Sequence, residues 1–526
     1  METRQQQYPI GIQDFEVLRK KDYLYVDKTA LIYQLTRTDY SNFLSRPRRF
    51  GKSLLVSTLE AYFQGRKELF RGLAIEQLEQ DWTVYPVLHL DFSTGSFNAA
   101  DDEFSKLLNN TIMEWEREYG SEASEETFSL RFKGVIKRAY EQTGQPVVVL
   151  IDEYDKPLLA SAYDSERNEQ IRNTLKAFYS VLKTQGRYLR FAFLTGITRF
   201  SRVSIFSDLN NLNDISMNKE YASLCGITDG ELHHYFDDAV QRMAAKMSLT
   251  TESMYGKLRQ QYDGYRFCWG TEGLYNPFSL LNAFYNQELG DYWFASGTPT
   301  FLVEMLRREN YDLQGLSGKK VTAGQLRDAG KDLRNIVSVM FQSGYLTIVD
   351  YNAEYDQYTL DFPNDEVRKG FFEALLPYYM PQRRSEQEIA PYIDMTEALR
   401  QGDPQGFVLE LKKFFDGGDY RMVTNKEVYF QSVIYILLRL VGIYVQVEYA
   451  TRDGRIDVVV TTDHYRYVIE LKRDSSAQAA LNQIHDKDYP LAFAFDDHRT
   501  LYKVALNFSS DINSITDDWL IEEGNA

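Results

Sequence analysis

Short apolar runs alternate with amphipathic segments through the first two hundred residues. Runs at 43–45, 87–92, 147–151 and 189–194 predict buried strands, because they are short, bounded by polar residues and rich in Val, Leu, Ile and Phe. The segments 103–119 and 168–185 place apolar residues three and four apart, as Ile171, Leu175, Phe178 and Leu182 do. Strands that alternate with such helices predict an α/β fold with a doubly wound, parallel sheet.

The pattern changes twice after this region. Residues 228–308 are mostly helical and predict a helical lid, and a helix, a hairpin at 345–361 and a helix at 364–376 suggest a winged-helix-like module. A polar linker is expected at 381–388. Beyond it we expect a helix at 426–441, strands at 444–450, 455–461 and 466–472, a helix at 476–487, and strands at 491–495 and 501–508. The predicted domains are therefore 1–227, 228–380 and 381–526, the last a separate α/β unit.

Composition restricts the classes of function. The chain of 526 residues carries a formal charge of −17, so contact with nucleic acid requires a local basic groove. Two cysteines and six unclustered histidines predict neither a disulfide framework nor a zinc site. The longest apolar stretch, 433–445, contains Arg439 and is too short to span a bilayer. We expect a cytoplasmic protein with no membrane partner.

The run from Arg46 to Ser53 contains Gly51-Lys52-Ser53 between a predicted strand and a helix. In a phosphate loop the backbone N–H groups cradle phosphate oxygens, the lysine reaches the terminal phosphates and the hydroxyl binds Mg²⁺. The usual motif has glycine where this chain has Arg46, so the tripeptide alone also fits a basic surface turn.

A second signal favours the phosphate loop. The buried run 147–151 delivers Asp152 and Glu153 to the carboxyl edge of the sheet, where open α/β sheets bind ligands. Asp152 is placed to hold Mg²⁺ and Glu153 to activate the water that attacks the γ-phosphate. Thr195, at the end of the fourth strand, can sense that phosphate. Arg199 or Arg202 is either an arginine finger across a subunit contact or, more simply, a surface residue.

Several separate motifs resemble one family of bacterial proteins. The chain has Tyr-Pro-Ile-Gly at 8–11, Tyr-Val-Asp-Lys-Thr at 25–29, Arg-Pro-Arg-Arg-Phe-Gly-Lys-Ser at 46–53, Leu-Ile-Asp-Glu-Tyr-Asp-Lys-Pro at 150–157 and Phe-Ser-Asp-Leu-Asn-Asn-Leu at 206–212. Together with Asn-Pro-Phe at 276–278 these resemble the AAA-ATPase-like family, in which arginine at position 46 is ordinary. The resemblance implies ATP as ligand and ATP hydrolysis as activity. The implied nucleotide-binding residues are Arg49, Phe50, Gly51, Lys52, Ser53, Leu54, Asp152 and Thr195, with Ser53 and Asp152 on the metal.

The last third carries a second chemical pattern. Asp457 lies on one predicted strand, and Glu470 and Lys472 share one face of the next, so the three side chains can converge. Two carboxylates, helped by the carbonyl of Leu471, suit Mg²⁺ or Mn²⁺, and a lysine beside them can position water for phosphodiester hydrolysis. A structural ion pair between Glu470 and Lys472 is the alternative.

In this order of strands and helices the pattern resembles the PD-(D/E)XK nuclease superfamily, which implies a restriction-endonuclease-like α/β domain. Glu427, on the preceding helix, matches the first acidic position, and Gln483, on the following helix, matches a polar position. Residues 405–526 nevertheless contain thirteen Lys and Arg against nineteen Asp and Glu. A nonspecific grip on DNA is therefore not evident here, and the winged-helix-like module serves either as that grip or for packing.

The combined hypothesis is an ATPase whose nucleotide state controls a metal-dependent nuclease. DNA or RNA is the expected substrate, the choice between them stays open, and a homo-oligomer is compatible with the sequence. The rival is a nucleotide-dependent switch or scaffold with a catalytically silent nuclease-like domain that binds nucleic acid or a protein. A pure ATPase motor is a third reading that no sequence feature favours.

Overall fold

The structure is a computed structural model, and it forms two compact units. One comprises Met1–Ser296 and Gly318–Asn364, and the other comprises Gly297–Ser317 and Asp365–Ala526. The division at 227 and 380 stays a prediction. The residues described are 7–38, 41–95, 97, 102–199, 212–295, 300–308, 311, 313–327, 335–379, 391–416, 426–440, 444–451, 454–487, 498–509, 511 and 514–524.

The first unit is organised around a five-stranded, all-parallel sheet with the order β2-β3-β4-β1-β5. Its strands are β1 (Ser41–Ser45), β2 (Val87–Asp91), β3 (Val147–Asp152), β4 (Leu189–Gly196) and β5 (Leu212–Asp214). The four predicted strands are confirmed, and β3 is buried along its whole length. Because β4 lies between β1 and β3, the phosphate loop and the Asp152 strand end flank the same central strand.

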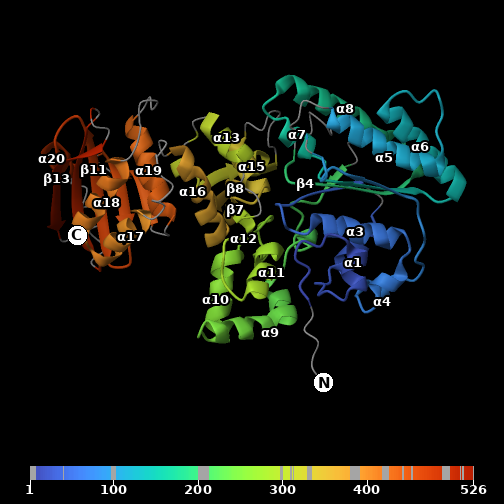
Figure 1. Cartoon of the computed structure of the whole chain (residues 1–526), viewed down its shortest axis with the longest axis horizontal. Coiled ribbons are helices and arrows are strands. Elements are labelled where there is room, and N and C mark those ends of the chain that lie inside the picture. Colours follow the sequence, from blue (N-terminus) through green and yellow to red (C-terminus); the bar gives the residue numbers. More distant parts are fainter. Residues whose placement is uncertain are drawn as a thin grey trace. The chain divides into compact units, whose positions relative to one another are not determined.

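Helices cover both faces of this sheet. Figure 1 shows α1 and α3 on one face and α5, α6 and α8 on the other. Asp164 caps α8, and the predicted residues Ile171, Leu175, Phe178 and Leu182 are all buried. The helices of this region are α1 (Phe15–Lys20), α2 (Thr29–Thr36), α3 (Lys52–Phe63), α4 (Ile75–Leu78), α5 (Glu103–Tyr119), α6 (Phe128–Thr143), α7 (Lys156–Ala160) and α8 (Ser165–Thr184), with short 3-10 turns at Lys67–Phe70 and Gly186–Tyr188.

The expected helical region follows a third 3-10 turn, Lys219–Tyr221. Its helices in this unit are α9 (Asp229–Lys246), α10 (Thr251–Tyr262), α11 (Pro277–Asn286) and α12 (Tyr292–Ala295). Thr228 and Glu231 form a reciprocal capping box that starts α9. Phe236, Tyr262 and Phe284 belong to the apolar core that joins the first three helices.

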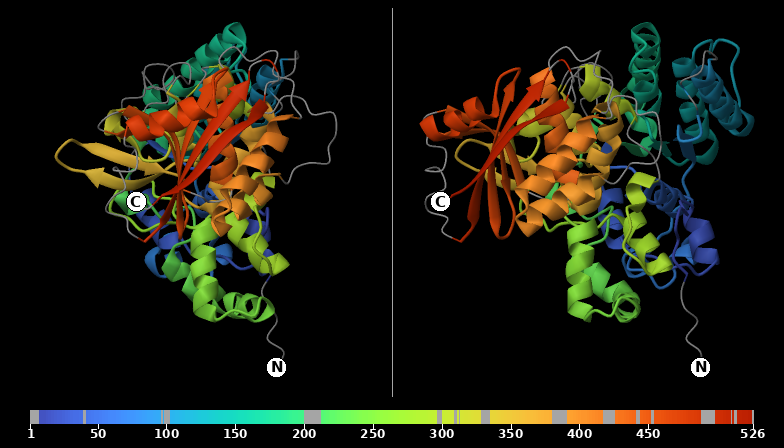
Figure 2. Two further views of the ribbon diagram at one scale, coloured as in Figure 1. Left: turned by 90° about the vertical axis from the view of Figure 1, so that its left-hand side faces the viewer. Right: turned by 60° about the vertical axis from the view of Figure 1, so that its left-hand side comes forward.

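A small three-stranded sheet completes the first unit, with the order β6-β8-β7. Its elements are β6 (Lys319–Thr322), α14 (Ala323–Arg327), α15 (Ile336–Gln342), β7 (Thr347–Asn352) and β8 (Gln357–Asp361). The predicted hairpin is confirmed as β7 and β8, and Figure 2 shows it projecting as a long ribbon. The sequence pattern missed β6.

The second unit holds a mixed sheet with the order β13-β12-β11-β10-β9, in which β11 and β12 are parallel and the other neighbours antiparallel. Its elements are α13 (Thr300–Arg308), a 3-10 turn at Leu313–Gly315, α16 (Asp365–Tyr379), α17 (Pro391–Gln401), α18 (Pro404–Asp416), α19 (Lys426–Leu440), β9 (Tyr444–Thr451), β10 (Gly454–Thr461), β11 (Tyr465–Arg473), α20 (Ala477–Asp486), β12 (Thr500–Ser509) and β13 (Ser514–Gly524). The expected strands β9 to β12 and helices α19 and α20 are confirmed. The strand expected at 491–495 and the linker at 381–388 lie outside the described residues.

The helix α20 packs its apolar side, including Ala480 and Ile484, against strand residues such as Val468 and Ala505. The even-numbered residues of β11 therefore face α20, which is the side that carries Glu470 and Lys472. Among the described helices, none is both long and apolar enough to cross a membrane.

Candidate active sites

The helix α3 begins at the phosphate loop without a side-chain cap. Gly51 occupies its N-cap position with φ +91°, a left-handed conformation that favours glycine. The first N–H groups of a helix have no intrahelical partner and carry the positive end of its dipole. A Cβ built at Gly51 would meet nothing within 4 Å, so there is room for an anion in front of these groups.

Lys52 is buried within the loop. Its Nζ donates to the carbonyl oxygens of Arg46 and Pro47 at 2.9 and 3.0 Å. These bonds hold the ammonium group over the loop beside the helix N-terminus. A phosphate oxygen would replace these neutral carbonyl acceptors with an ionised acceptor, so that both partners of the hydrogen bond would be charged.

The side chain of Arg46 supports the loop from inside the protein. It is fully buried, donates to the carbonyl oxygens of Ser45 and Ser216 at 2.9 and 2.8 Å, and lies 4.2 Å from the centre of the Phe267 ring. Burial lowers its pKa to about 10, so the guanidinium remains charged at neutral pH. Arginine in place of the leading glycine is therefore an internal anchor and does not form a basic surface turn.

The other loop residues have apolar surroundings. Phe50 is buried with its ring 4.8 Å from that of Tyr265, and the guanidinium of Arg49 lies 4.7 Å from the centre of the Phe278 ring. Arg49 has φ +65°, so the loop turns through a left-handed residue here as well as at Gly51. These contacts attach the loop to the helical region.

A cavity of about 100 Å³ borders the loop on the side of this helical region. Its walls come from the N-terminal segment, the start of α3, the segment 224–227 and the helices α9 and α11, and they are mostly apolar. They include Tyr25, Gly51, Leu54, Cys225 and Leu281. The cavity thus meets the uncapped helix at Gly51, and a planar apolar ring could lie in it while an attached phosphate group reaches α3.

The second half of this site lies where β3 ends. Asp152 is buried and accepts a hydrogen bond from the Thr195 hydroxyl of the neighbouring β4. It also accepts one from the backbone N–H of Glu153 at 3.0 Å. The sheet thus brings Asp152, Glu153 and Thr195 together, and in this structure the Thr195 hydroxyl is directed to Asp152.

Glu153 has the electrostatic character of a proton acceptor. Burial raises the pKa of its carboxyl group, the neighbouring Asp152 raises it further, and Lys52 acts in the opposite direction. Its backbone is left-handed, with φ +50°. A carboxylate of raised pKa is a better base than an exposed one, as activation of a water molecule requires.

Sequence reasoning missed Asp155, three residues after Asp152. Its buried carboxylate accepts hydrogen bonds from the N–H groups of Ile197 and Thr198 at 3.0 and 2.6 Å, and from the Thr198 hydroxyl at 2.7 Å. Asp155 therefore fastens the turn that carries Glu153 to the end of β4. The only sequence signal was a second aspartate in the run 150–157.

The residues at this site fit a nucleotide with Mg²⁺, since the uncapped helix and the space at Gly51 suit phosphate groups. Ser53 and Asp152 would hold the ion. Among the described residues no group of three or more His, Cys, Asp and Glu could hold a metal by itself. Nucleotide-bound Mg²⁺ in proteins keeps water and phosphate oxygens as ligands and needs few from the protein.

The structure describes only one of the two arginines considered as an arginine finger. Arg202 lies outside the described residues. Arg199 forms an ion pair with Asp214, and the two side chains are only 13% and 12% exposed. Arg199 is therefore a half-buried, ion-paired residue, and whether it or Arg202 acts as an arginine finger stays a prediction.

The second site lies on the neighbouring strands β10 and β11. Because Val458 is opposite Ile469, Asp457 comes opposite Glu470. A carboxylate oxygen of Asp457 accepts a hydrogen bond from the backbone N–H of Leu471 at 2.8 Å. The strand register thus brings the two predicted carboxylates together across the sheet.

Glu470 is the buried centre of this group. Its side chain is 1% exposed, and its Oε2 has no hydrogen-bond partner among the described residues. Burial, and after it the charge of Asp457, raises the pKa of the Glu470 carboxyl group to about 7, although Lys472 opposes this. An unpaired buried carboxylate oxygen is costly unless it is protonated or binds a cation.

Lys472 connects the predicted residues. Its Nζ donates to Oε1 of Glu470 at 3.1 Å and to the side-chain carbonyl of Gln483 on α20. Asp457, Glu470, Lys472 and Gln483 therefore form one group. Glu427 lies at the start of α19, but its side chain is outside the described residues.

This group fits a divalent cation because Glu470 offers a buried carboxylate oxygen without a partner, beside the second carboxylate of Asp457. These two residues would hold the ion, with the Leu471 carbonyl as a third oxygen. The described residues contain no third acidic or histidine ligand here.

The chain matches two family models. Residues 9–206 match a predicted AAA-ATPase, and residues 425–518 match the PD-(D/E)XK nuclease superfamily. The protein belongs to the AAA-ATPase-like family and carries a C-terminal domain of the PD-(D/E)XK nuclease superfamily. It is similar along nearly its whole length to a protein of Azotobacter chroococcum mcd 1 described as an uncharacterized protein in the vnfD 5' region. The two are 35% identical over 522 residues, which cover 96% of this chain and 97% of the relative.

Proposed function

We propose that the protein binds and hydrolyses ATP at the phosphate loop, and that its nucleotide state controls metal-dependent cutting of nucleic acid by the C-terminal domain. The observation that carries the nuclease half is the convergence of Asp457, Glu470 and Lys472, with a buried carboxylate oxygen left without a partner. Most buried polar atoms in folded proteins have a hydrogen-bond partner, so this oxygen calls for a specific explanation, and a bound cation supplies one.

For ATP, the proposal assigns the phosphates to the N-terminus of α3 and the base to the adjoining apolar cavity. Lys52 exchanges its carbonyl acceptors for phosphate oxygens, and Ser53 and Asp152 hold Mg²⁺. Glu153 orients the attacking water and takes its proton, for which its raised pKa is suited. The two free cysteines suit a reducing compartment such as the cytoplasm.

In the C-terminal domain, a bound divalent ion supplies charge that stabilises the attacked phosphate group. Asp457 and Glu470 hold the ion once Glu470 has lost its proton. Lys472 orients the water molecule and stabilises the negative charge that develops. Gln483 fixes the position of the lysine through its side-chain carbonyl.

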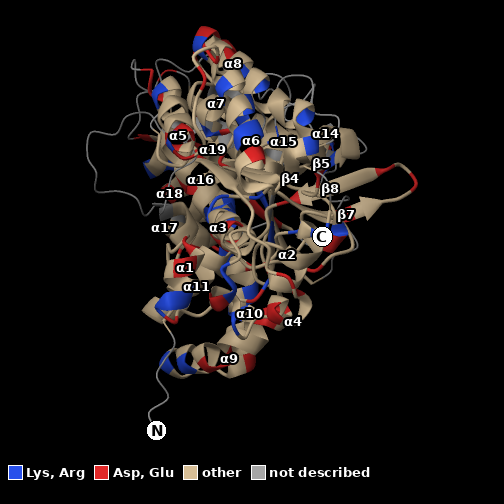
Figure 3. Cartoon of the chain, turned by 90° about the vertical axis from the view of Figure 1, so that its right-hand side faces the viewer, with Lys and Arg blue, Asp and Glu red and all other residues tan. Residues whose placement is uncertain are grey.

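The acidic charge of the chain favours a second candidate, a nucleotide-dependent scaffold with a silent nuclease-like domain. Residues 405–526 carry thirteen basic against nineteen acidic residues. The β7–β8 hairpin adds no basic groove, because residues 347–361 include Asp350, Glu354, Asp356 and Asp361 but no Lys or Arg. In Figure 3 the tip of the hairpin carries the colour of Asp and Glu. In this scaffold hypothesis the hairpin and the C-terminal domain bind a protein partner.

The two candidates differ in one assay. Purified wild type is incubated with plasmid DNA, single-stranded DNA and RNA, with Mg²⁺ or Mn²⁺, in the presence and absence of ATP. We expect cutting that changes with ATP, its loss in Lys472→Ala, and unchanged ATP turnover in that variant. Lys487→Ala is the matched control, since Lys487 is exposed at the end of α20.

ATP binding is measured in parallel. Lys52→Ala should abolish binding of a fluorescent ATP analogue, and Lys67→Ala, an exposed lysine beyond α3, should bind as the wild type does. If all three nucleic acids stay intact under every condition while ATP is still hydrolysed, the nuclease half is refuted and the scaffold is favoured. If cutting occurs but never changes with ATP or in Lys52→Ala, the proposed control is refuted.

A further inference from the structure

Arg199 lies three residues beyond the end of β4, and neither proposed reaction gives it a role. Its guanidinium is paired with Asp214 at the end of β5, and both side chains are nearly buried. An arginine that acts on a neighbouring subunit needs a charge that is free to leave its own chain. Here the charge is held within the chain, and releasing it would leave the Asp214 carboxylate uncompensated.

A series of hydrogen bonds connects Asp214 with the phosphate loop. It accepts a hydrogen bond from the N–H of Ser216 at 2.9 Å. The Ser216 hydroxyl accepts one from the N–H of Ser45 at 2.9 Å, and the Ser216 carbonyl accepts one from the Arg46 guanidinium at 2.8 Å. These are the residues on which the loop begins.

The guanidinium of Arg46 makes two more contacts with this segment, donating to the carbonyl oxygens of Tyr221 and Ala222 at 3.2 and 3.3 Å. The carbonyl of Arg46 in turn accepts from Nζ of Lys52 at 2.9 Å. The position of the lysine that reaches the phosphates is therefore linked, through Arg46, to the segment that holds Asp214.

On its other side Arg199 is bonded to the Glu153 turn through Thr198. The N–H and hydroxyl of Thr198 donate to Asp155 at 2.6 and 2.7 Å, and its carbonyl accepts from the Tyr154 hydroxyl at 3.0 Å. Tyr154 and Asp155 directly follow Glu153.

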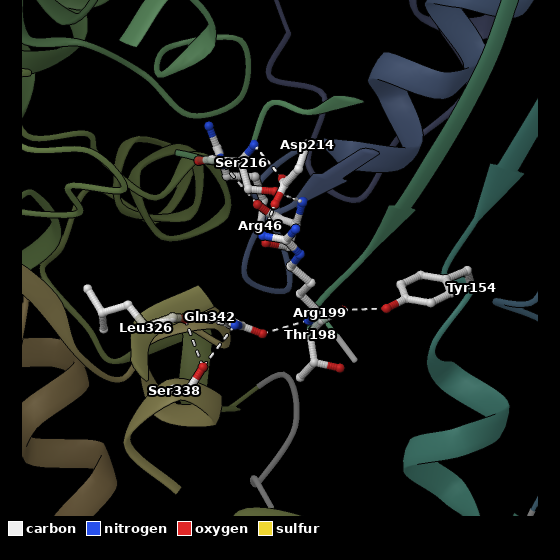
Figure 4. A network of polar contacts seen from close by, with 10 residues as sticks. Arg46, Tyr154, Thr198, Arg199, Asp214, Ser216, Leu326, Ser338 and Gln342 are labelled. Atoms are coloured by element: carbon white, nitrogen blue, oxygen red, sulfur yellow. Dashed lines mark hydrogen bonds and ion pairs between the residues drawn. The ribbon is translucent and has the colours of Figure 1, made fainter. Parts of the chain in front are cut away.

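Besides the hydrogen bonds through Asp214 and through Thr198, a third branch of the hydrogen-bond network connects Arg199 with α15. The N–H of Arg199 donates to Oε1 of Gln342 at 2.6 Å, and Nε2 of Gln342 donates to the Ser338 hydroxyl and the Leu326 carbonyl at 2.9 and 3.0 Å. Figure 4 shows the side chain of Arg199 reaching toward Asp214 and Arg46, with Thr198 and Gln342 beside its backbone. Arg199 is thus the junction of three segments that are far apart in the sequence.

We propose that Arg199 is a positioning residue that acts within its own subunit: paired with Asp214, it fixes the phosphate loop and the Glu153 turn at the separation that ATP hydrolysis requires. This role rests on the proposed ATPase activity. Hydrolysis needs the γ-phosphate, held by Lys52, and the water, held by Glu153, in one geometry, and a small displacement between them lowers the rate steeply. Binding of ATP depends on the loop and the adjoining cavity and not on the exact distance between the loop and Glu153, so it is less sensitive to such a displacement.

The test uses the full-length protein and separates kcat from KM. Arg199→Gln and Asp214→Asn should each lower kcat for ATP at least tenfold, with KM and the Kd of a fluorescent ATP analogue changed less than threefold. The double variant should lose no more of its kcat than either single variant, since each of the three variants breaks the same ion pair between Arg199 and Asp214. Arg199→Lys should recover part of kcat, and Arg187→Gln, an exposed arginine before β4, should match the wild type.

A mixing experiment separates action within a subunit from action between subunits. Arg199→Gln and Glu153→Gln proteins are mixed in equal amounts under conditions that allow subunits to exchange. If Arg199 acts within its subunit, the mixture has the mean activity of its components. Activity well above that mean would overturn the proposal, because it would show that an intact Arg199 serves the Glu153 of another subunit.

Two further outcomes are distinguishable. A wild type that binds but never hydrolyses ATP overturns the proposed ATPase function, and this role with it. An active wild type whose kcat is unchanged in Arg199→Gln and Asp214→Asn overturns the positioning role alone. Thermal melting of each variant checks that the fold is intact.

Discussion

Replacement of Glu470 by glutamine should stabilise the metal-free protein, and by much more at alkaline pH than at pH 5. The Glu470 side chain is 1% exposed, and burial beside Asp457 raises its pKa from 4.5 to about 7. Glutamine is of the same size and keeps the Oε1 acceptor for Lys472, but it carries no charge. The substitution therefore removes the electrostatic cost of Glu470 without a cavity.

The sign and size of the effect follow from linkage. Between pH 4.5 and about 7 the folded protein keeps a proton that the unfolded chain releases, so the free energy of unfolding falls as pH rises. Each pH unit between the folded and unfolded pKa values corresponds to about 1.4 kcal/mol. Glu470 therefore destabilises the wild type by about 3 kcal/mol at pH 8.5 and by less than about 1 kcal/mol at pH 5.

Urea unfolding in EDTA at these two pH values measures the difference between Glu470→Gln and wild type. Glu523→Gln, an exposed glutamate on β13, is the control and should show no difference at either pH. Saturating Mg²⁺ should stabilise the wild type at pH 8.5 but not Glu470→Gln, which has lost a metal ligand. The reasoning is refuted if the variant's advantage is the same at both pH values, or if the wild type is the more stable protein at pH 8.5 in EDTA.

Two further predictions concern the first unit. Glu153→Gln should bind ATP normally but hydrolyse it at least about a hundredfold more slowly in single-turnover assays, because the base is lost. Since the pKa of Glu153 is raised, the rate of ATP hydrolysis by the wild type should rise with pH above the ordinary carboxylate range. A rate that does not change with pH there would contradict this role. Gly264→Ala should destabilise the protein by more than about 2 kcal/mol, since φ is +99° and the new Cβ would lie 2.0 Å from the carbonyl oxygen of Pro363. Gly256→Ala, within α10 and with nothing near its Cβ, should instead stabilise by about 0.5–1 kcal/mol, and equal melting temperatures for the two variants would count against the argument.

The sequence by itself determined most strands of the two sheets that bear the candidate sites, and the residues at the ends of those strands. A run such as Val147–Asp152 can be satisfied only as a buried strand, so its length and its acidic end appear in the local pattern. Alternation along β11 likewise placed Glu470 and Lys472 on one face, because side chains repeat every two residues. The edge strands β5, β6 and β13 were not predicted from the sequence, since exposed or short strands have few apolar residues in a regular pattern.

Only the tertiary structure decided what Arg46, Asp155 and Arg199 do. Each has polar partners that local sequence cannot reveal, because the chain must fold before a carbonyl or carboxylate from another segment arrives beside it. Arg46 is the clearest case. It stands where the usual phosphate-loop motif has glycine, and its buried guanidinium donates hydrogen bonds to carbonyl oxygens some 170 residues away. A buried charge is tolerated only where such partners converge, and that convergence is a property of the fold.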